Sequence, residues 1–244
     1  HDDRRTLDPI SDRHPELTMG DAYLVQDALT GLRVRRGQKR VGWKLGYTSQ
    51  VMRRQMGIAE ANFGPLTDEM LLDQDDDVMG RYVQPRVEPE VALRFGCEVP
   101  GDADRSTVLD SVSSAHGALE VVDSAFTDYR FRIEDNTADG SSAAGVVVGD
   151  EIDLGTIVDV DVRLLVDGVE VGRGRGRDAS GHPADGVVWL VRRLAAQGRA
   201  IRAGDVVITG GLTAAHALVP GGRITAVFDG VERACVRHGR TTLD

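Results

Sequence analysis

The sequence predicts a strand-rich α+β fold, in which a mixed sheet rolls into a barrel-like form after a smaller, helix-containing amino-terminal part. Glycine makes up 29 of the 244 residues and aromatic residues only 5%, which favours tight turns and close contact between backbones. The apolar fraction of 41% is sufficient for a globular core. Short β-branched runs separated by glycine indicate the strands: GVVVGDEI, TIVDVDVRLLV, GVEVGRG, DVVITGG and RITAVF.

The amino-terminal part begins with a helix and a strand. MGDAYLVQDALTGL repeats its apolar residues at helical spacing, and Thr18 stands where a capping residue is expected. KRVGWKLGYTS then alternates with the period of a strand. VMRRQMGI, at 51–58, returns to helical spacing.

The acidic run DQDDD, at 73–77, is most simply a solvated loop, and we place a soft domain boundary there. The boundary separates an amino-terminal α/β part, 1–76, from a β-rich, metal-binding part, 77–244. Within the second part, VDGVE is typical of a two-residue hairpin turn. One helix is predicted from Pro183, a residue tolerated in a first turn, to a terminating Gly198.

The overall charge argues against nucleic acid or anionic membrane as a partner. The formal net charge is −10, so the surrounding field repels phosphate groups. No apolar run is long enough to span a bilayer, and the polar start HDDRRTLDP is unlike a signal peptide. The two cysteines, Cys97 and Cys235, are far apart and fit a reducing compartment. We therefore expect a cytoplasmic protein.

The stretch RYVQPRVEPEVALRF contains a pair of acids that is unusual for a strand. Period-two alternation points Glu88 and Glu90 to the same face, with their stems about 7 Å apart. Two such carboxylates can bind one hard cation. A solvated face of an edge strand is the alternative, and Pro89, which cannot donate to a ladder, suits an edge.

A third acid lies in the apolar run GALEVVDSAF. Burying the Glu120 carboxylate there requires a cation, a proton or several donors. A shared metal satisfies this need, and a buried salt bridge or a surface position remains an alternative. Asp123 points to the opposite side by alternation. Three carboxylates without nitrogen or sulfur ligands favour Mg²⁺ or Mn²⁺ over zinc.

Three further segments are candidates for the wall of a site. In GWKLGYTS, Lys44 has only Gly42 and Gly46 beside it on its face, which indicates a cavity with one cation or an ordinary surface lysine. NTADGSSAAG and ITGGLT are rich in small residues and suit either anion contacts through backbone amides or plain turns.

Taken in order, six segments resemble the hydratase and decarboxylase branch of the fumarylacetoacetate hydrolase superfamily. The resemblance covers nearly the whole chain from about Asp21. Within the branch, RVEPE, QMGI followed by FGPLTDEM, and TGGLT are more similar to 4-oxalocrotonate decarboxylases than to 2-hydroxypentadienoate hydratases. The six segments are VGWKLGYTSQVMRRQMGI, FGPLTDEM, PRVEPEVAL, ALEVVDSAF, ADGSSAAGVVVG and ITGGLT.

The resemblance implies a β-rich fold and a role for each matched residue. It implies a divalent metal, Mg²⁺ or Mn²⁺, on Glu88, Glu90 and Glu120. It implies that Lys44 positions or stabilises an anionic group and that Asp68 assists proton transfer. The residues expected to contact the substrate are Thr48, Ser49, Ser141, Ser142, Thr209 and Gly210.

The chain departs from the family pattern at two positions. Where the family usually has DSR, this chain has Ala125 in place of the arginine, and where it usually has ADN, this chain has Gly140 in place of the asparagine. Both changes remove polar groups from segments expected to line the site. They leave the metal ligands intact and the substrate open.

The reaction implied is the metal-dependent decarboxylation of a small 2-oxo-3-enedioate, which makes the protein a lyase. Hydration of a 2-hydroxypenta-2,4-dienoate is the alternative, as is a related lyase reaction on an unusual 2-oxo acid of a biosynthetic pathway. A non-catalytic subunit that stabilises a partner enzyme is the alternative of another class. The resemblance also implies a homo-oligomer and a possible hydratase partner.

Overall fold

The computed structural model describes residues 5–49, 53–54 and 57–239, and its strands form two sheets. The first has the order β2-β1-β10-β5-β6-β7-β3 with β11 beside β5, and the second the order β4-β13-β12-β8-β9. The first sheet comprises β1 (Arg40–Gly46), β2 (Asn62–Thr67), β3 (Leu71–Leu72), β5 (Arg86–Phe95), β6 (Val112–Val122), β7 (Ala143–Ile152), β10 (Val206–Ile208) and β11 (His216–Ala217). The second comprises β4 (Asp76–Asp77), β8 (Asp161–Val166), β9 (Val169–Arg175), β12 (Arg223–Phe228) and β13 (Val231–Arg237).

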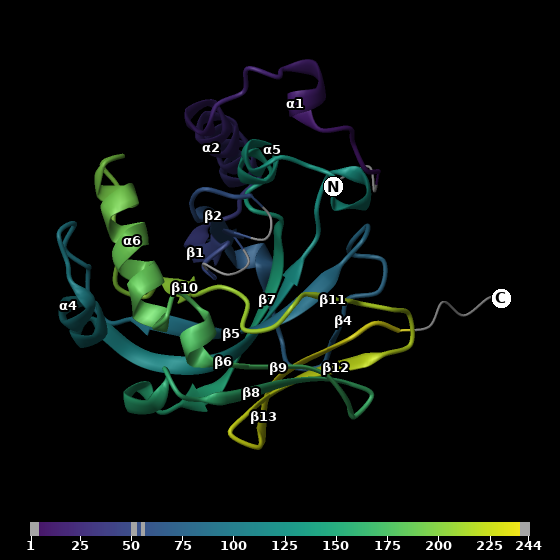
Figure 1. Cartoon of the computed structure of the whole chain (residues 1–244), viewed down its shortest axis with the longest axis vertical. Coiled ribbons are helices and arrows are strands. Elements are labelled where there is room, and N and C mark those ends of the chain that lie inside the picture. Colours follow the sequence, from purple (N-terminus) through teal and green to yellow (C-terminus); the bar gives the residue numbers. More distant parts are fainter. Residues whose placement is uncertain (1–4, 50–52, 55–56, 240–244) are drawn as a thin grey trace.

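Helices cover one end and one side of the first sheet. In Figure 1, α1, α2 and α5 gather at one end of the first sheet, while α4 and α6 lie along its side. The second sheet, with β8, β9, β12 and β13, lies across the opposite side of the long strands (Figure 1). The helices are α1 (Ile10–Arg13), α2 (Met19–Arg35), α4 (Arg105–Asp110), α5 (Ile133–Ala138) and α6 (Pro183–Ala195), and the short 3₁₀ turns are η1 (Asp68–Met70), η2 (Thr127–Tyr129), η3 (Leu154–Thr156) and η4 (Gly176–Asp178).

This architecture confirms the predicted strand-rich α+β fold. Antiparallel pairs dominate, but β1 runs parallel to β10 and β3 parallel to β7, so the first sheet is mixed. Its long central strands curl into a half-barrel (Figure 1). Residue 76 begins β4 of the second sheet, and the first sheet contains strands from both sides of this position. The proposed boundary therefore divides the sequence without dividing the sheets.

The main core lies between the two sheets. Val87, Val91 and Leu93 on one face of β5 are fully buried and belong to the same apolar cluster as Phe228 of β12. Burial of this face stabilises the fold by about 25 cal/mol per Å² of apolar surface removed from water. Gly149 lets the second sheet approach, because a Cβ there would lie 1.9 Å from the Arg233 carbonyl oxygen. The other face of β5 is left for polar residues.

Local sequence signals agree with the structure at three elements. Thr18 forms the expected capping box at the start of α2, accepting from the Asp21 amide. The hairpin between β8 and β9 turns at Asp167 and Gly168, both with positive φ as a two-residue turn requires. Helix α6 begins at Pro183. The helix expected over 51–58 lies largely outside the described residues.

The structure corrects the position expected for Pro89. Strand β5 is not at an edge: β6 pairs with its whole length, and β10 and β11 pair with the two ends of its other side. Between them, Pro89 faces a loop, whose Leu212 amide donates to the Pro89 carbonyl oxygen at 2.9 Å. A proline fits here because the loop requires no amide donor from this residue.

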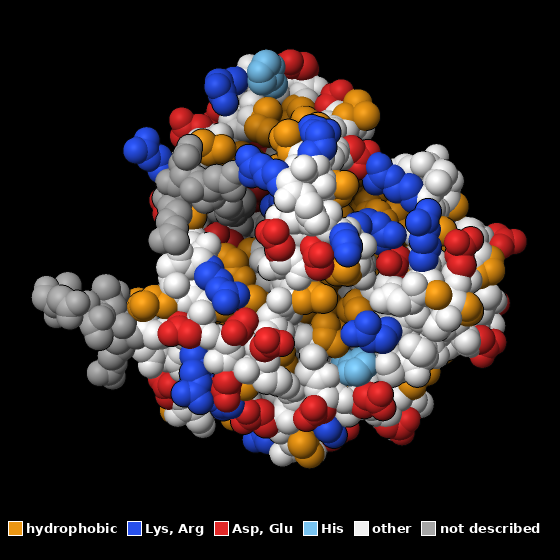
Figure 2. Space-filling model, turned by 180° about the vertical axis from the view of Figure 1, so that it is seen from behind, with side chains coloured by type: hydrophobic (Ala, Val, Ile, Leu, Met, Phe, Trp, Pro, Cys, Tyr) orange, Lys and Arg blue, Asp and Glu red, His pale blue; other side chains and the backbone are white. Residues whose placement is uncertain are grey.

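The surface carries both signs of charge. Lys and Arg side chains gather in the upper right of the face in Figure 2, and Asp and Glu side chains are spread over its lower part.

In the described part of the chain, no helix has both the length and the hydropathy needed to cross a membrane.

Candidate metal centre and active-site cavity

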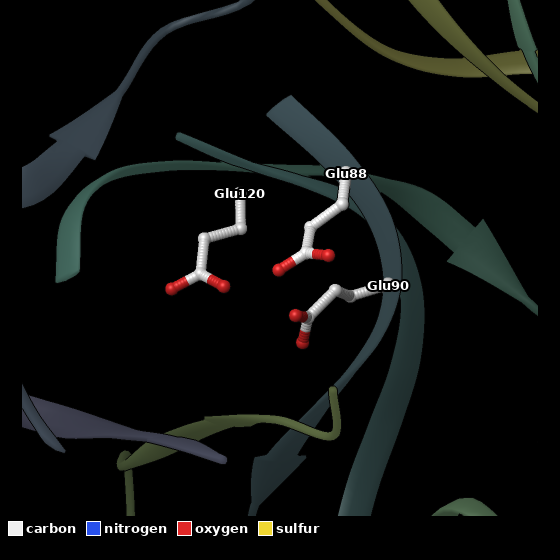
Figure 3. Close-up of side chains that lie close together, drawn as sticks. All are labelled: Glu88, Glu90 and Glu120. Carbon is white, nitrogen blue, oxygen red and sulfur yellow. The ribbon is translucent and has the colours of Figure 1, made fainter. Parts of the chain in front are cut away.

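Three glutamates meet on the inner face of the half-barrel. Glu88 and Glu120 are direct partners across β5 and β6, and Glu90 follows two residues after Glu88 on the same face. One carboxylate oxygen from each lies within 4.8 Å of the other two. Figure 3 shows the three side chains converging from the two strands. The alternative of a solvated strand face is therefore excluded for Glu90 and Glu120, which are fully buried.

The hydrogen bonding of this cluster is incomplete. Glu90 accepts from the Gly210 amide at 2.7 Å through one oxygen, but its other oxygen has no hydrogen-bond partner among the described residues. Lys44 Nζ lies 3.1 Å from Glu120 Oε2 as an ion pair, without the alignment of a hydrogen bond, and both Glu120 oxygens are otherwise unpartnered in the described chain. Such buried oxygens fit the coordination needs of a hard divalent cation.

Burial and mutual repulsion disturb the protonation of the cluster. Burial, followed by the charge of Glu120, raises the pKa of Glu88 to about 7. Burial also raises the pKa of Glu90 and of Glu120, partly opposed by Lys44. Burial alone would lower the pKa of Lys44, but the neighbouring glutamates raise it overall. Three carboxylates thus face one ammonium, an imbalance that a bound cation of charge +2 would cancel.

The cluster opens onto a cavity of about 530 Å³. Lys44 and Glu88 line it, whereas Glu90 and Glu120 lie behind its surface. The cavity is large enough for a small organic acid. Of the residues expected to contact a substrate, those that line the cavity are Thr48, Ser49, Ser141 and Ser142.

Thr209 and Gly210 do not line the cavity. The Thr209 hydroxyl donates to the Val91 carbonyl at 3.1 Å, and the Gly210 amide binds Glu90. At Gly210, with φ of +105°, an added Cβ would lie 2.0 Å from Thr48 Oγ1. The TGG segment thus holds a predicted metal ligand in place, and its glycine is required by this close approach.

Asp68 lies apart from the glutamate cluster and outside the cavity lining. It begins η1, is partly exposed, and accepts from the Lys39 amide at 2.9 Å. Its position gives no support to the predicted role in proton transfer, which stays a prediction.

The space beside Lys44 differs from the expected one. The glycines on its face do not open a gap for a ligand: a Cβ at Gly42 would lie 1.9 Å from the Val206 carbonyl oxygen, and one at Gly46 would lie 2.2 Å from Asn62 Oδ1. Protein atoms fill both places. Lys44 instead reaches the cavity while donating to the Ser141 carbonyl at 3.0 Å.

A buried amide network fixes the serine wall. Asn62 donates to Asn136 Oδ1 at 2.9 Å and accepts from the Ser141 hydroxyl at 2.9 Å. Asn136 in turn donates to the Ser142 hydroxyl at 2.9 Å. Asn62 and Asn136 were not predicted, because asparagines 74 residues apart give no local pattern.

Backbone strain gathers around the same cavity. Five non-glycine residues that line it have positive φ, a conformation that costs free energy for side chains of this kind. They lie in three separate segments, so the surrounding fold must hold each of them. The five are Tyr47, Asp128, Tyr129, Ser141 and Ser142.

Several other residues that line the cavity were not predicted from the sequence. Arg86 has the same parity on β5 as Glu88, so alternation could have identified it. Tyr129 and Phe131 come from the segment after β6 and carry no comparable signal. The two family departures, Ala125 and Gly140, lie in neighbouring segments but do not line the cavity.

Comparison with known proteins agrees with this arrangement. The family described as fumarylacetoacetate (FAA) hydrolase C-terminal matches residues 60–239. A 4-oxalocrotonate decarboxylase from Pseudomonas sp. is 34% identical over 221 residues, 85% of this chain and 84% of that protein. A 2-hydroxyhexa-2,4-dienoate hydratase from Comamonas testosteroni is 31% identical over 237 residues, 93% of this chain and 89% of that protein.

A solved structure shares the fold almost throughout. The 4-oxalocrotonate decarboxylase from Pseudomonas putida G7, complexed with magnesium and adipate, has a TM-score of 0.90 at 28% identity and covers 96% of this chain and 91% of that one. The two relatives named above are thus enzymes of different kinds, a decarboxylase and a hydratase. With most of its length matched, this chain belongs to the fumarylacetoacetate hydrolase family.

Proposed function

We propose that this protein is a divalent-metal-dependent lyase that decarboxylates a 2-oxo-3-enedioate. The observation that carries the proposal is the convergence of Glu88, Glu90 and Glu120 beside a cavity that Lys44 also lines. Glu90 and Glu120 are fully buried, and their oxygens include ones without a hydrogen-bond partner in the described chain. The decarboxylase relative at 34% identity and the decarboxylase structure with magnesium and adipate support the reaction and the metal.

The three glutamates would hold the metal, which supplies Lewis-acid stabilisation for charge that develops on the 2-oxo group. Oxygen-only ligands favour Mg²⁺ or Mn²⁺. Lys44, buried beside Glu120, provides a fixed positive charge for a substrate anion or a developing oxyanion. Burial of Glu90 and Glu120 keeps water away from this end of the cavity.

The bond that breaks joins the far carboxylate to the carbon chain. Its electron pair moves through the conjugated double bond toward the 2-oxo oxygen, CO₂ leaves, and a dienolate remains. The reaction requires no covalent nucleophile. The serine hydroxyls of the wall are already engaged with Asn62 and Asn136, which suits positioning better than attack.

Hydration is the second candidate, because a hydratase relative is 31% identical over 93% of this chain. A hydratase would accept the dienol product of decarboxylation, so the same site could bind either compound. The cytoplasmic location, the homo-oligomer, the hydratase partner and the non-catalytic subunit all stay predictions.

The test offers the purified protein both substrates in parallel. With 2-oxo-3-hexenedioate we expect CO₂ release that requires Mg²⁺ or Mn²⁺ and stops after chelation. With 2-hydroxypenta-2,4-dienoate we expect little loss of the dienol chromophore. Metal-dependent consumption of the dienol without CO₂ release from the enedioate would assign hydration instead. If metal binds and neither compound reacts, both assignments are wrong.

A further inference from the structure

Arg86 continues the line of the glutamate cluster along β5. Cross-strand pairs place Glu90 opposite Ala118, Glu88 opposite Glu120 and Arg86 opposite Val122, all on one face. Arg86 and Val122 both line the cavity. The strand that holds two predicted metal ligands therefore carries a cation one step further from the buried Glu90, at an exposed position.

The guanidinium of Arg86 is held but not neutralised. Its central carbon lies 4.1 Å from the centre of the Tyr129 ring, a cation–π contact. No carboxylate of the described chain lies within ion-pair distance of it, whereas Arg81, Arg130 and Arg223 each have such a partner. Stacking orders the planar fork and leaves its donors available for a planar anion.

Few charged residues line the cavity together with Arg86. The charged lining residues of the described chain are Lys44, Arg86, Glu88 and Asp128. Lys44 is already paired with Glu120 at the closed end. Arg86 is the other cation of the lining, and it pairs with no carboxylate of the described chain. Asp128 directly precedes Tyr129, on which Arg86 stacks, and is the acid that a second substrate anion would meet.

The two-residue repeat of the strand is similar in length to a six-carbon diacid. Arg86 is two residues from Glu88, a step of about 6.6 Å along a strand. The end carbons of a six-carbon chain are joined by five bonds of about 1.5 Å and lie about 6 Å apart when extended. We propose that Arg86 binds the second carboxylate of the substrate and makes the site selective for dicarboxylates. This inference rests on the proposed function, which places one end of the substrate at the three glutamates.

The expected role is in binding rather than in bond breaking. An arginine that pairs with the departing carboxylate stabilises its charge before CO₂ forms, which does not favour departure. Loss of Arg86 should therefore raise KM for the enedioate and leave kcat unchanged or slightly increased.

The experiment compares adipate with hexanoate, two ligands of equal carbon number that differ by one carboxylate. In calorimetric titration with Mg²⁺ present, the wild-type protein should bind adipate about tenfold more tightly than hexanoate. Arg86→Gln should weaken the binding of adipate about tenfold and leave the binding of hexanoate unchanged. Asp128→Asn should strengthen the binding of adipate, because it removes a negative charge from the cavity lining. Asparagine tolerates the left-handed conformation of residue 128, so the backbone should not change. Arg81→Gln, at an arginine outside the cavity lining, is the matched control.

Each result decides one of the two proposals. If wild type does not prefer adipate, or if Arg86→Gln keeps the preference, the assignment of Arg86 is overturned even when CO₂ is released. If no CO₂ is released but the preference exists and requires Arg86, the dicarboxylate selectivity stands and the proposed reaction fails. Arg86→Lys, which retains the charge without the planar fork, should keep part of the preference.

Discussion

Two clusters of charged residues in this protein differ in how their positive and negative charges balance. The glutamate cluster (Glu88, Glu90, Glu120 and Lys44) has three acids for one base and is almost entirely removed from water. The Asp75 cluster (Asp75, Arg223, Glu232, Arg237 and Cys235) joins β12, β13 and the turn before β4 and has two acids for two bases. Its Asp75 side chain remains 42% exposed.

The difference separates a site from a structural contact. In the Asp75 cluster each charge has an opposite charge nearby, and the arginines hold the pKa of Asp75 below its ordinary range. In the glutamate cluster burial pushes the carboxylate pKa values upward, so the fold carries an electrostatic cost that only a cation or protons can offset. An unbalanced buried cluster therefore indicates a ligand, whereas a balanced one does not.

The largest effect is expected from Glu90→Gln, which keeps the shape of a predicted metal ligand and removes its charge. Metal affinity should fall steeply, and turnover should fall by about a hundredfold or more. The metal-free protein should become more stable, because one uncompensated buried charge is gone. Calorimetric metal titration and thermal unfolding measure both effects. Glu232→Gln, in the Asp75 cluster, is the control, and metal binding by Glu90→Gln equal to wild type would contradict the assignment.

The next effect is expected from Lys44→Met, which removes the one base of the glutamate cluster at similar volume. Breaking a buried ion pair typically costs about 3 kcal/mol, and protonation of a glutamate should limit the loss here. We expect a lower melting temperature without metal, partial recovery with Mg²⁺, and at least about a tenfold loss of turnover. Lys39→Met, at an exposed lysine, is the control. Full turnover in Lys44→Met would exclude a role for this ammonium.

A pH series compares the clusters without mutation. A carboxyl whose folded pKa is raised contributes stability at low pH and loses it as pH rises through the folded value. With the pKa of Glu88 near 7, the metal-free protein should lose stability between about pH 5 and about pH 8. With saturating Mg²⁺ this loss should disappear, and metal binding near neutral pH should release protons. Thermal scans at several pH values would contradict this if both forms gave the same profile.

Much of the site was predictable from alternation in two strands. Glu88, Glu90 and Glu120 share one face because each strand has a period of two, and that period also identifies Arg86. Lys44 was left open between cavity and surface, because burial depends on which strands become neighbours. The gap that admits Pro89 exists only because β10 and β11 pair with different ends of β5. Such features depend on long-range topology, and no local pattern carries them.

The smallest effect is expected from Asp75→Asn, which removes one acid from the balanced cluster. Asp75 has φ of +63°, and asparagine tolerates this left-handed conformation, so the backbone should not change. Its carboxylate accepts from Arg223 at 2.8 Å and from Arg237 at 3.0 Å. Because these ion pairs are partly exposed and screened by water, the loss of unfolding free energy should be below about 1 kcal/mol. It should be smaller still in high salt.

Turnover and metal affinity of Asp75→Asn should equal those of wild type, because the cluster contributes no residue to the cavity lining. Denaturant unfolding at low and high salt measures the stability change, and the metal titration used for Glu90→Gln measures affinity. A large, salt-independent loss of stability would mean that exposure underestimates how strongly this cluster holds the second sheet. A loss of metal affinity would mean that the two clusters are coupled through β13, which contacts both β6 and β7.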